Sequence, residues 1–127
     1  MKFNVKVVFV ISDLSRKPKI LVDKETRLLP STELKNDETV AECLKRLLET
    51  HIDLNFEWME SFIIDNGYLR VKSDEIALIF SYQTPRIDLY KTSNSEWVNN
   101  AQLLEEKTKD IKRHPEEVEF IYRTGAS

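Results

Sequence analysis

The segment TVAECLKRLLETH, residues 39–51, decides the fold of this chain. Thr39 is followed three residues later by Glu42, the spacing of a capping box, in which each side chain accepts a hydrogen bond from the other residue's backbone N–H. At helical spacing, one half of the segment is mostly apolar and carries Val40, Cys43, Leu44, Leu47, Leu48 and His51, with Thr50 at its edge. Glu42, Arg46 and Glu49 share a narrow sector on the other side. The segment therefore predicts an amphipathic helix from Val40 to His51, with Glu42 and Arg46 as a surface ion pair.

The segments around this helix read mainly as strands. Residues 3–11 alternate between apolar and mixed positions, and residues 75–82 are apolar almost throughout, which is typical of strands covered on both faces. Asn66-Gly67 predicts a type I′ hairpin turn, and Ser73-Asp74 predicts another turn. The other expected strands are 19–23, 56–65, 68–72, 88–90 and 96–98.

Two more helices are expected near the C-terminus. Asn99 or Asn100 can cap a helix from Ala101 to about His114, and Pro115 stops it. A shorter helix is predicted over 116–123. Strands followed by helices, with no repeat or linker between them, indicate one α+β domain.

The composition agrees with a single domain spanning residues 1–127. The chain is 41% apolar and 32% charged, which is enough to build one core. Its 19 Lys+Arg against 22 Asp+Glu give a net charge of −3, which argues against a partner that is a nucleic acid duplex. Cys43 is the single cysteine, so no intramolecular disulfide can form and we expect a reducing, cytoplasmic location. No targeting or membrane-spanning segment is recognisable, so no membrane partner is expected.

Several residues have the spacing of a known sequence signature, G-x5-E-x7-R-E-U-x-E-E-x-G-U, in which U is a bulky apolar residue. The matching residues are Glu38, Arg46, Leu48 and Leu54, with Leu29-Pro30 before them and Trp97 after them as similar flanking features. On these residues the chain resembles the Nudix hydrolase superfamily over almost its whole length. The resemblance implies a Nudix-like α/β/α sandwich around a mixed β-sheet.

The differences from the signature fall on its chemical positions. The two glycines are replaced by Thr32 and Asp53, the glutamate after the arginine by Leu47, and the two adjacent glutamates by Thr50 and His51. In the family those glutamates hold Mg²⁺, which activates water and neutralises the charge of a diphosphate. Leucine offers no metal ligand, a threonine hydroxyl is a weak one, and a histidine nitrogen suits zinc or iron better. The resemblance therefore predicts a degenerate Nudix box without a metal site and without a required cofactor.

Two functions are carried forward from the resemblance. The first is a catalytically inactive domain that binds a nucleotide-type small molecule or a protein partner. The alternative is an active hydrolase of nucleoside diphosphates linked to another moiety, with an Mg²⁺ or Mn²⁺ site rebuilt from Glu38, Glu33 and Glu75. A homodimer is left open, because members of the family often dimerise.

Other candidate residues have simpler interpretations. His51 lies on the apolar half of its helix, so we expect it to be packed or hydrogen-bonded. Cys43 is expected to be a small buried side chain, and Trp58 and Trp97 are expected to pack in the core. Scattered arginines such as Arg27 are expected at the surface.

Overall fold

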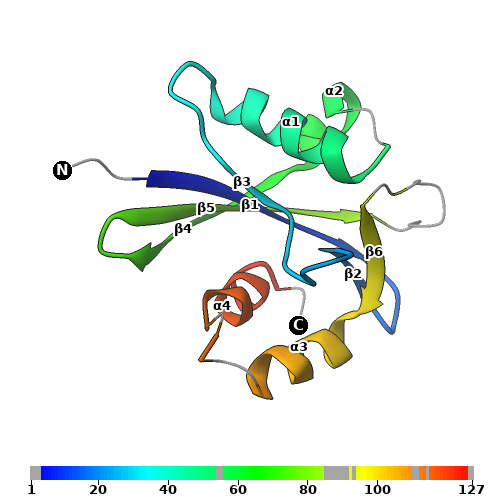
Figure 1. Cartoon of the computed structure of the whole chain (residues 1–127). Coiled ribbons are helices and arrows are strands. Elements are labelled where there is room, and N and C mark those ends of the chain that lie inside the picture. The colour runs from blue at the N-terminus through cyan, green and yellow to red at the C-terminus, as the bar shows by residue number, and fades with distance from the viewer. Residues whose placement is uncertain are drawn as a thin grey trace.

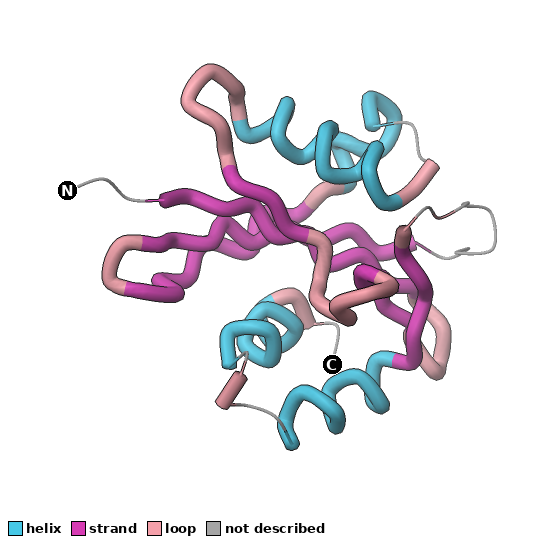
Figure 2. The backbone as a smooth tube through the Cα atoms, in the orientation of Figure 1, coloured by secondary structure: helices cyan, strands magenta, loops and turns pink. Residues whose placement is uncertain are grey.

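The structure is a computed structural model, and it describes residues 4–53, 56–84, 92, 94–109, 112–113 and 115–125, except for the side chain of Trp58. Within these residues, one mixed sheet lies between two layers of helices (Figures 1 and 2). This is the α/β/α sandwich that the resemblance implies. No helix in this part of the chain is long and apolar enough to cross a membrane.

Six strands among the described residues form the sheet, in the order β4-β5-β1-β2-β6, with β3 paired to β1. Their bounds are Asn4–Asp13 (β1), Lys19–Asp23 (β2), Ser31–Glu33 (β3), Ile64–Lys72 (β4), Glu75–Thr84 (β5) and Ser95–Asn99 (β6). β1 and β5 are parallel over ten residue pairs, whereas β2 and β3 run antiparallel to β1. Residues 7–11 of β1 are almost fully buried. They contribute alternately to two hydrophobic clusters, one on each face of the sheet, so this strand is central to both.

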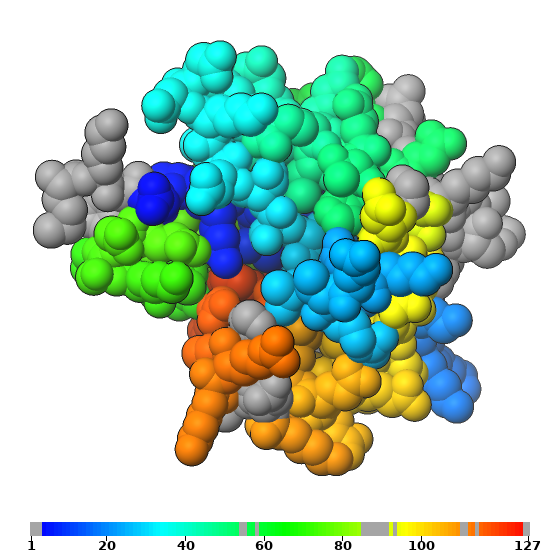
Figure 3. Space-filling model, in the orientation of Figure 1, coloured from blue at the N-terminus to red at the C-terminus, as the bar shows by residue number. Residues whose placement is uncertain are grey.

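The helices cover opposite faces of the sheet (Figure 1). Helix α1 (Val40–His51) and helix α2 (Phe56–Met59), which a 3₁₀ helix at Glu60–Phe62 follows, lie on one face. Helices α3 (Asn100–Lys109) and α4 (Pro115–Arg123) lie on the other. The connection between β2 and β3 crosses the front of the molecule between the two layers (Figure 3).

Helix α1 begins and ends where the sequence predicts. The Glu42 N–H donates to Thr39 Oγ1 at 3.1 Å, and the Thr39 N–H donates to Glu42 Oε1 at 3.0 Å, so the capping box is complete. The buried side chains of the helix are Cys43, Leu44, Leu47, Leu48 and His51. Its apolar half is therefore the face that packs on the sheet.

The strand expected over 56–65 is confirmed only at Ile64 and Asp65, which begin β4, and is wrong over residues 56–62. Phe56 and Met59 are 5% and 0% exposed and lie three residues apart. Helical geometry therefore places both side chains on the buried face of α2. The Asn66-Gly67 turn is also wrong, because these residues lie inside β4 at a bulge between Asp65 and Tyr68, with Gly67 at φ 83°. The hairpin turn between β4 and β5 is Ser73-Asp74, as expected.

The C-terminal helices differ from the prediction mainly at their ends. Asn99 caps α3 by accepting the Gln102 N–H at 3.1 Å. The described helix ends at Lys109 rather than near His114, and Pro115 is the first residue of α4. The strand expected at 88–90 lies outside the described residues.

Candidate functional site

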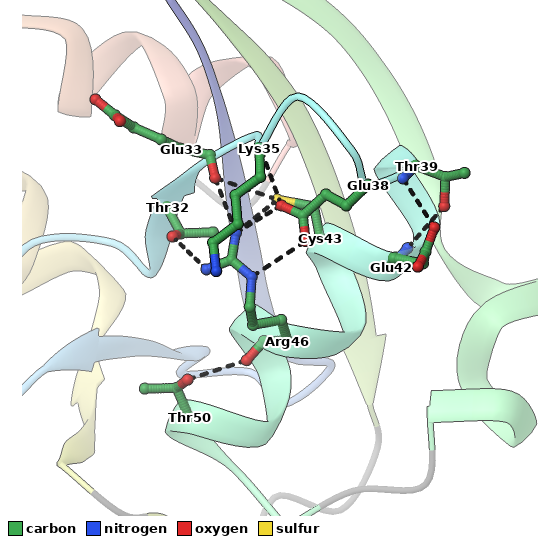
Figure 4. A network of polar contacts seen from close by, with 9 residues as sticks. All are labelled: Thr32, Glu33, Lys35, Glu38, Thr39, Glu42, Cys43, Arg46 and Thr50. Atoms are coloured by element: carbon green, nitrogen blue, oxygen red, sulfur yellow. Dashed lines mark hydrogen bonds and ion pairs between the residues drawn. The ribbon is translucent and has the colours of Figure 1, made fainter.

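Arg46 joins three positions of the signature in one network (Figure 4). Its guanidinium donates to both carboxylate oxygens of Glu38, at 3.2 and 2.7 Å, and to Thr32 Oγ1 at 3.0 Å. A further bond of 2.9 Å runs to the backbone oxygen of Glu33. The network ties β3 and the connection after it to the middle of α1. The predicted ion pair between Glu42 and Arg46 is wrong, because the Glu42 carboxylate is used in the helix cap.

This network fixes the charge of Glu38. The hydrogen bonds from Arg46, followed by the Lys35 N–H, lower the pKa of Glu38 to about 2. A carboxylate with that pKa, held by a two-pronged guanidinium, is a weak proton acceptor at neutral pH. Burial, together with the neighbouring Glu38, raises the pKa of the Cys43 thiol to about 11. Cys43 is therefore a buried, neutral thiol, as the sequence predicts.

The three positions where the family carries glutamates after the arginine are used for structure. Leu47 is 2% exposed and belongs to the core between α1 and the sheet. Thr50 is exposed, and its hydroxyl donates to the Arg46 backbone oxygen at 3.0 Å (Figure 4). His51 is buried, and its Nδ1 shares a hydrogen bond with Ser95 Oγ of β6. Burial lowers the pKa of His51, and the charge of Asp23 opposes this shift.

The structure does not bring the other candidate acids together with Glu38. In β3, side chains alternate between the faces of the sheet, so Thr32 reaches α1 while the exposed Glu33 side chain points away from the Arg46 network (Figure 4). Glu75 pairs at 3.5 Å with Lys6, whose ammonium lies 5.6 Å from the ring centre of Phe120 in α4. Glu75 therefore belongs to the opposite face of the sheet from Glu38.

The donor set does not fit an Mg²⁺ site. Asp53 is exposed, and Leu54, the last signature position, lies outside the described residues. Within the part of the chain that the structure describes, no three His, Cys, Asp or Glu side chains are placed to hold a metal ion. Mg²⁺ needs a near-octahedral shell of oxygen ligands, whereas Leu47 offers none and the Glu38 carboxylate is already held by Arg46.

The connection between β2 and β3 separates two hollows. A small pocket of about 100 Å³ lies on the side of His51, Asp23 and Ser31. A larger pocket of about 470 Å³ lies between this connection and α3, and its lining residues are Glu25, Thr26, Arg27, Leu28, Leu103, Glu106, Lys107 and Arg113. Thr26 and Leu28 line both hollows, so the loop that carries them forms a wall shared by the two pockets.

Buried charges hold this loop in place, and sequence reasoning missed them. Lys107 Nζ pairs with Glu117 Oε1 at 3.0 Å and donates to the Arg27 backbone oxygen at 3.0 Å. Glu117 also accepts the Leu29 N–H at 2.8 Å. Arg27, at φ 58°, is a partly exposed surface residue, as expected, and it pairs with Glu96 and Glu106 at 2.9 and 3.1 Å. Lys107 and Glu117 are 10 residues apart, whereas the other partners are 69 to 88 residues apart, and no local pattern links them.

Comparison with solved structures gives the fold. A NUDIX hydrolase from Nitrosomonas europaea superposes with a TM-score of 0.64 at 16% identity, covering 98% of this chain and 90% of that one. The chain has the fold of the Nudix hydrolases. The NUDIX domain of Shewanella oneidensis NrtR, complexed with ADP ribose, gives 0.50 at 16% identity over 83% of this chain and 77% of that one. No protein-family model and no curated protein matches the sequence.

A third solved structure is longer than this chain. It is a bifunctional NMN adenylyltransferase/ADP ribose pyrophosphatase from Francisella tularensis, complexed with AMP and a manganese ion. It superposes with a TM-score of 0.59 at 18% identity over 82% of this chain, which spans only 36% of that protein. At these identities the likeness establishes the Nudix-like fold, and the function has to be argued from the site.

Proposed function

We propose that this chain is a Nudix-fold domain that binds a nucleotide-type ligand without hydrolysing it. The observation that carries the proposal is the use of the signature positions beside α1. Leu47 is in the core, His51 is hydrogen-bonded to Ser95, and Glu38 is held by Arg46. The positions that specify the fold have kept their roles, whereas those that would hold a metal have structural partners.

The chemistry of the replacements supports the absence of hydrolysis. A carboxylate in position to activate water needs a pKa near the working pH or a metal ion beside it. Glu38 has neither property, since its pKa is about 2 and the neighbouring side chains are poor ligands for Mg²⁺. Glu33 and Glu75, the remaining acids of the alternative hydrolase, do not meet Glu38 on one face of the sheet.

The larger pocket supports the binding of a nucleotide-type ligand. Its volume of about 470 Å³ is within the range of roughly 300–1,000 Å³ found for small-molecule sites. The exposed Arg113 offers N–H donors suited to phosphate oxygens. The NUDIX domain of Shewanella oneidensis NrtR, which is complexed with ADP ribose, is a domain of this fold with such a ligand. We also place the protein in the cytoplasm, because its single thiol is buried and unpaired with another cysteine.

Calorimetric titration with ADP ribose and AMP, with and without Mn²⁺, tests the proposal together with chromatography of the products. We expect saturable binding that does not need the metal, and no product. Arg113→Ala should weaken binding, whereas Arg16→Ala, the same loss of charge in the exposed β1–β2 turn, should not. Metal-dependent turnover that Glu38→Gln abolishes would instead establish the alternative hydrolase. If neither compound binds, the nucleotide ligand is wrong.

A further inference from the structure

A third hollow lies near the N-terminal end of α1. It has a volume of about 250 Å³ and is formed by α1, α2, the segment after α2 and β5. Its apolar lining consists of Val40, Ala41, Leu44, Phe56, Ile63 and Phe80, and two carboxylates, Glu60 and Asp65, complete it. We call this hollow the α1–α2 groove. It shares no lining residue with the pocket assigned to the nucleotide-type ligand, so the two sites are independent.

The apolar surface continues outside the groove. Phe62, next to the lining residue Ile63, is 56% exposed. Large apolar side chains that are exposed next to an apolar hollow are typical of an interaction site. An apolar side chain of a partner would enter the groove, while its neighbours cover Phe62.

The charge of the groove selects the kind of partner. Both ionisable side chains of its lining, Glu60 and Asp65, are acidic. Glu57 of α2 is a third carboxylate, and it forms an ion pair with Lys45 at 2.8 Å. An apolar groove with acidic groups is complementary to an apolar side chain flanked by lysine or arginine, and it repels phosphate groups of nucleic acids and lipids.

The edge of the sheet beside the groove is poorly suited to strand addition. β4 is an edge strand, but it is interrupted by the bulge between Asp65 and Tyr68. Arg123 of α4 donates to the Tyr68 backbone oxygen at 3.1 Å, so that acceptor is already used. Bulges and basic side chains at an edge are the usual means by which proteins prevent strand pairing. A partner would therefore dock through side chains in the groove.

From the apolar lining, the exposed Phe62 and the acidic groups, we propose that the α1–α2 groove is a docking site for a peptide segment of another protein. That segment carries an apolar anchor side chain next to lysine or arginine. The arrangement follows the general form of peptide recognition by a hydrophobic groove, in which an apolar anchor gives affinity and flanking charges give selectivity.

A selection from a displayed library of random peptides, followed by fluorescence anisotropy with the selected peptides, tests this proposal. We expect the selected sequences to combine an apolar residue with neighbouring lysine or arginine. Ala41→Phe, which fills the groove, should weaken their binding by about tenfold or more, equivalent to about 1.4 kcal/mol. Ala101→Phe, at an exposed position of α3, is the matched control and should leave binding unchanged.

The charge requirement is tested separately. Glu60→Lys should weaken binding of the same peptides several-fold, whereas Glu105→Lys, an equal charge change on α3, should not. Circular dichroism establishes that each variant is folded. The proposal is overturned if the selection yields no enrichment, if the enriched sequences are acidic, or if folded Ala41→Phe binds as the unmodified protein does. A dimer in sedimentation velocity that Ala41→Phe dissociates would also overturn it, because the occupant would then be a second copy.

Discussion

Restoring the first missing glutamate of the signature should destabilise the protein rather than create a metal ligand. Leu47 is 2% exposed in the core between α1 and the sheet. Leu47→Glu loses much of the about 1.5–3 kcal/mol that burial of a leucine contributes. Full burial raises a carboxyl pKa by up to about 3–5 units, and each unit corresponds to about 1.36 kcal/mol. Because the unfolded pKa of a glutamate is about 4.3, this ionisation penalty cannot exceed about 3.7 kcal/mol at pH 7. The combined loss at neutral pH is therefore about 5–7 kcal/mol, comparable with the whole stability of a small domain.

The pH dependence separates the two parts of this loss. The introduced carboxyl has a higher pKa in the folded protein than in the unfolded chain, so its penalty is absent below about pH 4 and grows as the pH rises. Urea unfolding of Leu47→Glu at several pH values, beside the volume-conserving Leu47→Met, measures it. Leu47→Met should cost less than about 1.5 kcal/mol at every pH. A Leu47→Glu variant that is as stable as the unmodified protein at pH 7, or that Mn²⁺ stabilises, would refute the reasoning.

Three other variants test the interactions described above. The low pKa of Glu38 reflects its bonds to Arg46, so Glu38→Gln should lower the free energy of unfolding, with the full loss present above pH 4.5. The difference from the unmodified protein should shrink as the pH falls towards 2, which acid unfolding curves measure. Ser95→Ala should cost about 1–3 kcal/mol in urea unfolding, since it leaves a buried nitrogen of His51 without its hydrogen bond. Lys107→Met should cost about 3–5 kcal/mol, because it leaves a buried carboxylate unpaired; a loss below about 1 kcal/mol would contradict the buried ion pair.

Helices and strands could be predicted from the sequence where short-range interactions, such as helix capping and side-chain spacing, determine them. The bounds of α1 could be predicted because the capping box at Thr39 and Glu42 and the helical spacing of leucines agree with each other. The strand at Lys19–Asp23 was likewise predicted within its observed bounds. In these segments the local preference and the tertiary packing favour the same structure.

The errors occur where tertiary packing decides. Residues 56–65 contain aromatic and branched side chains that favour a strand, but burial of Phe56 and Met59 against α1 favours a short helix. Asn66-Gly67 has the sequence of a tight turn, and the structure uses the left-handed glycine for a bulge instead.

The candidate site could be predicted only in part. The spacing of Glu38 and Arg46 links them as two positions of one signature, but their direct contact depends on how the connection after β3 folds back onto α1. The apolar half of α1 correctly placed His51 in the interior, whereas its partner Ser95 lies 44 residues away and has no sequence signal. The α1–α2 groove was not predicted, because its lining comes from helices and strands that are distant in the sequence.

Titration of the protein with Mn²⁺, followed by the electron paramagnetic resonance signal of the free ion, tests the central claim most directly. The structure assigns the positions beside α1 to packing and hydrogen bonding, so we predict no saturable binding of Mn²⁺ at millimolar concentrations or below. Stoichiometric, submillimolar binding that is lost in Glu38→Gln would contradict this account, because it would mean that the signature still builds a metal site.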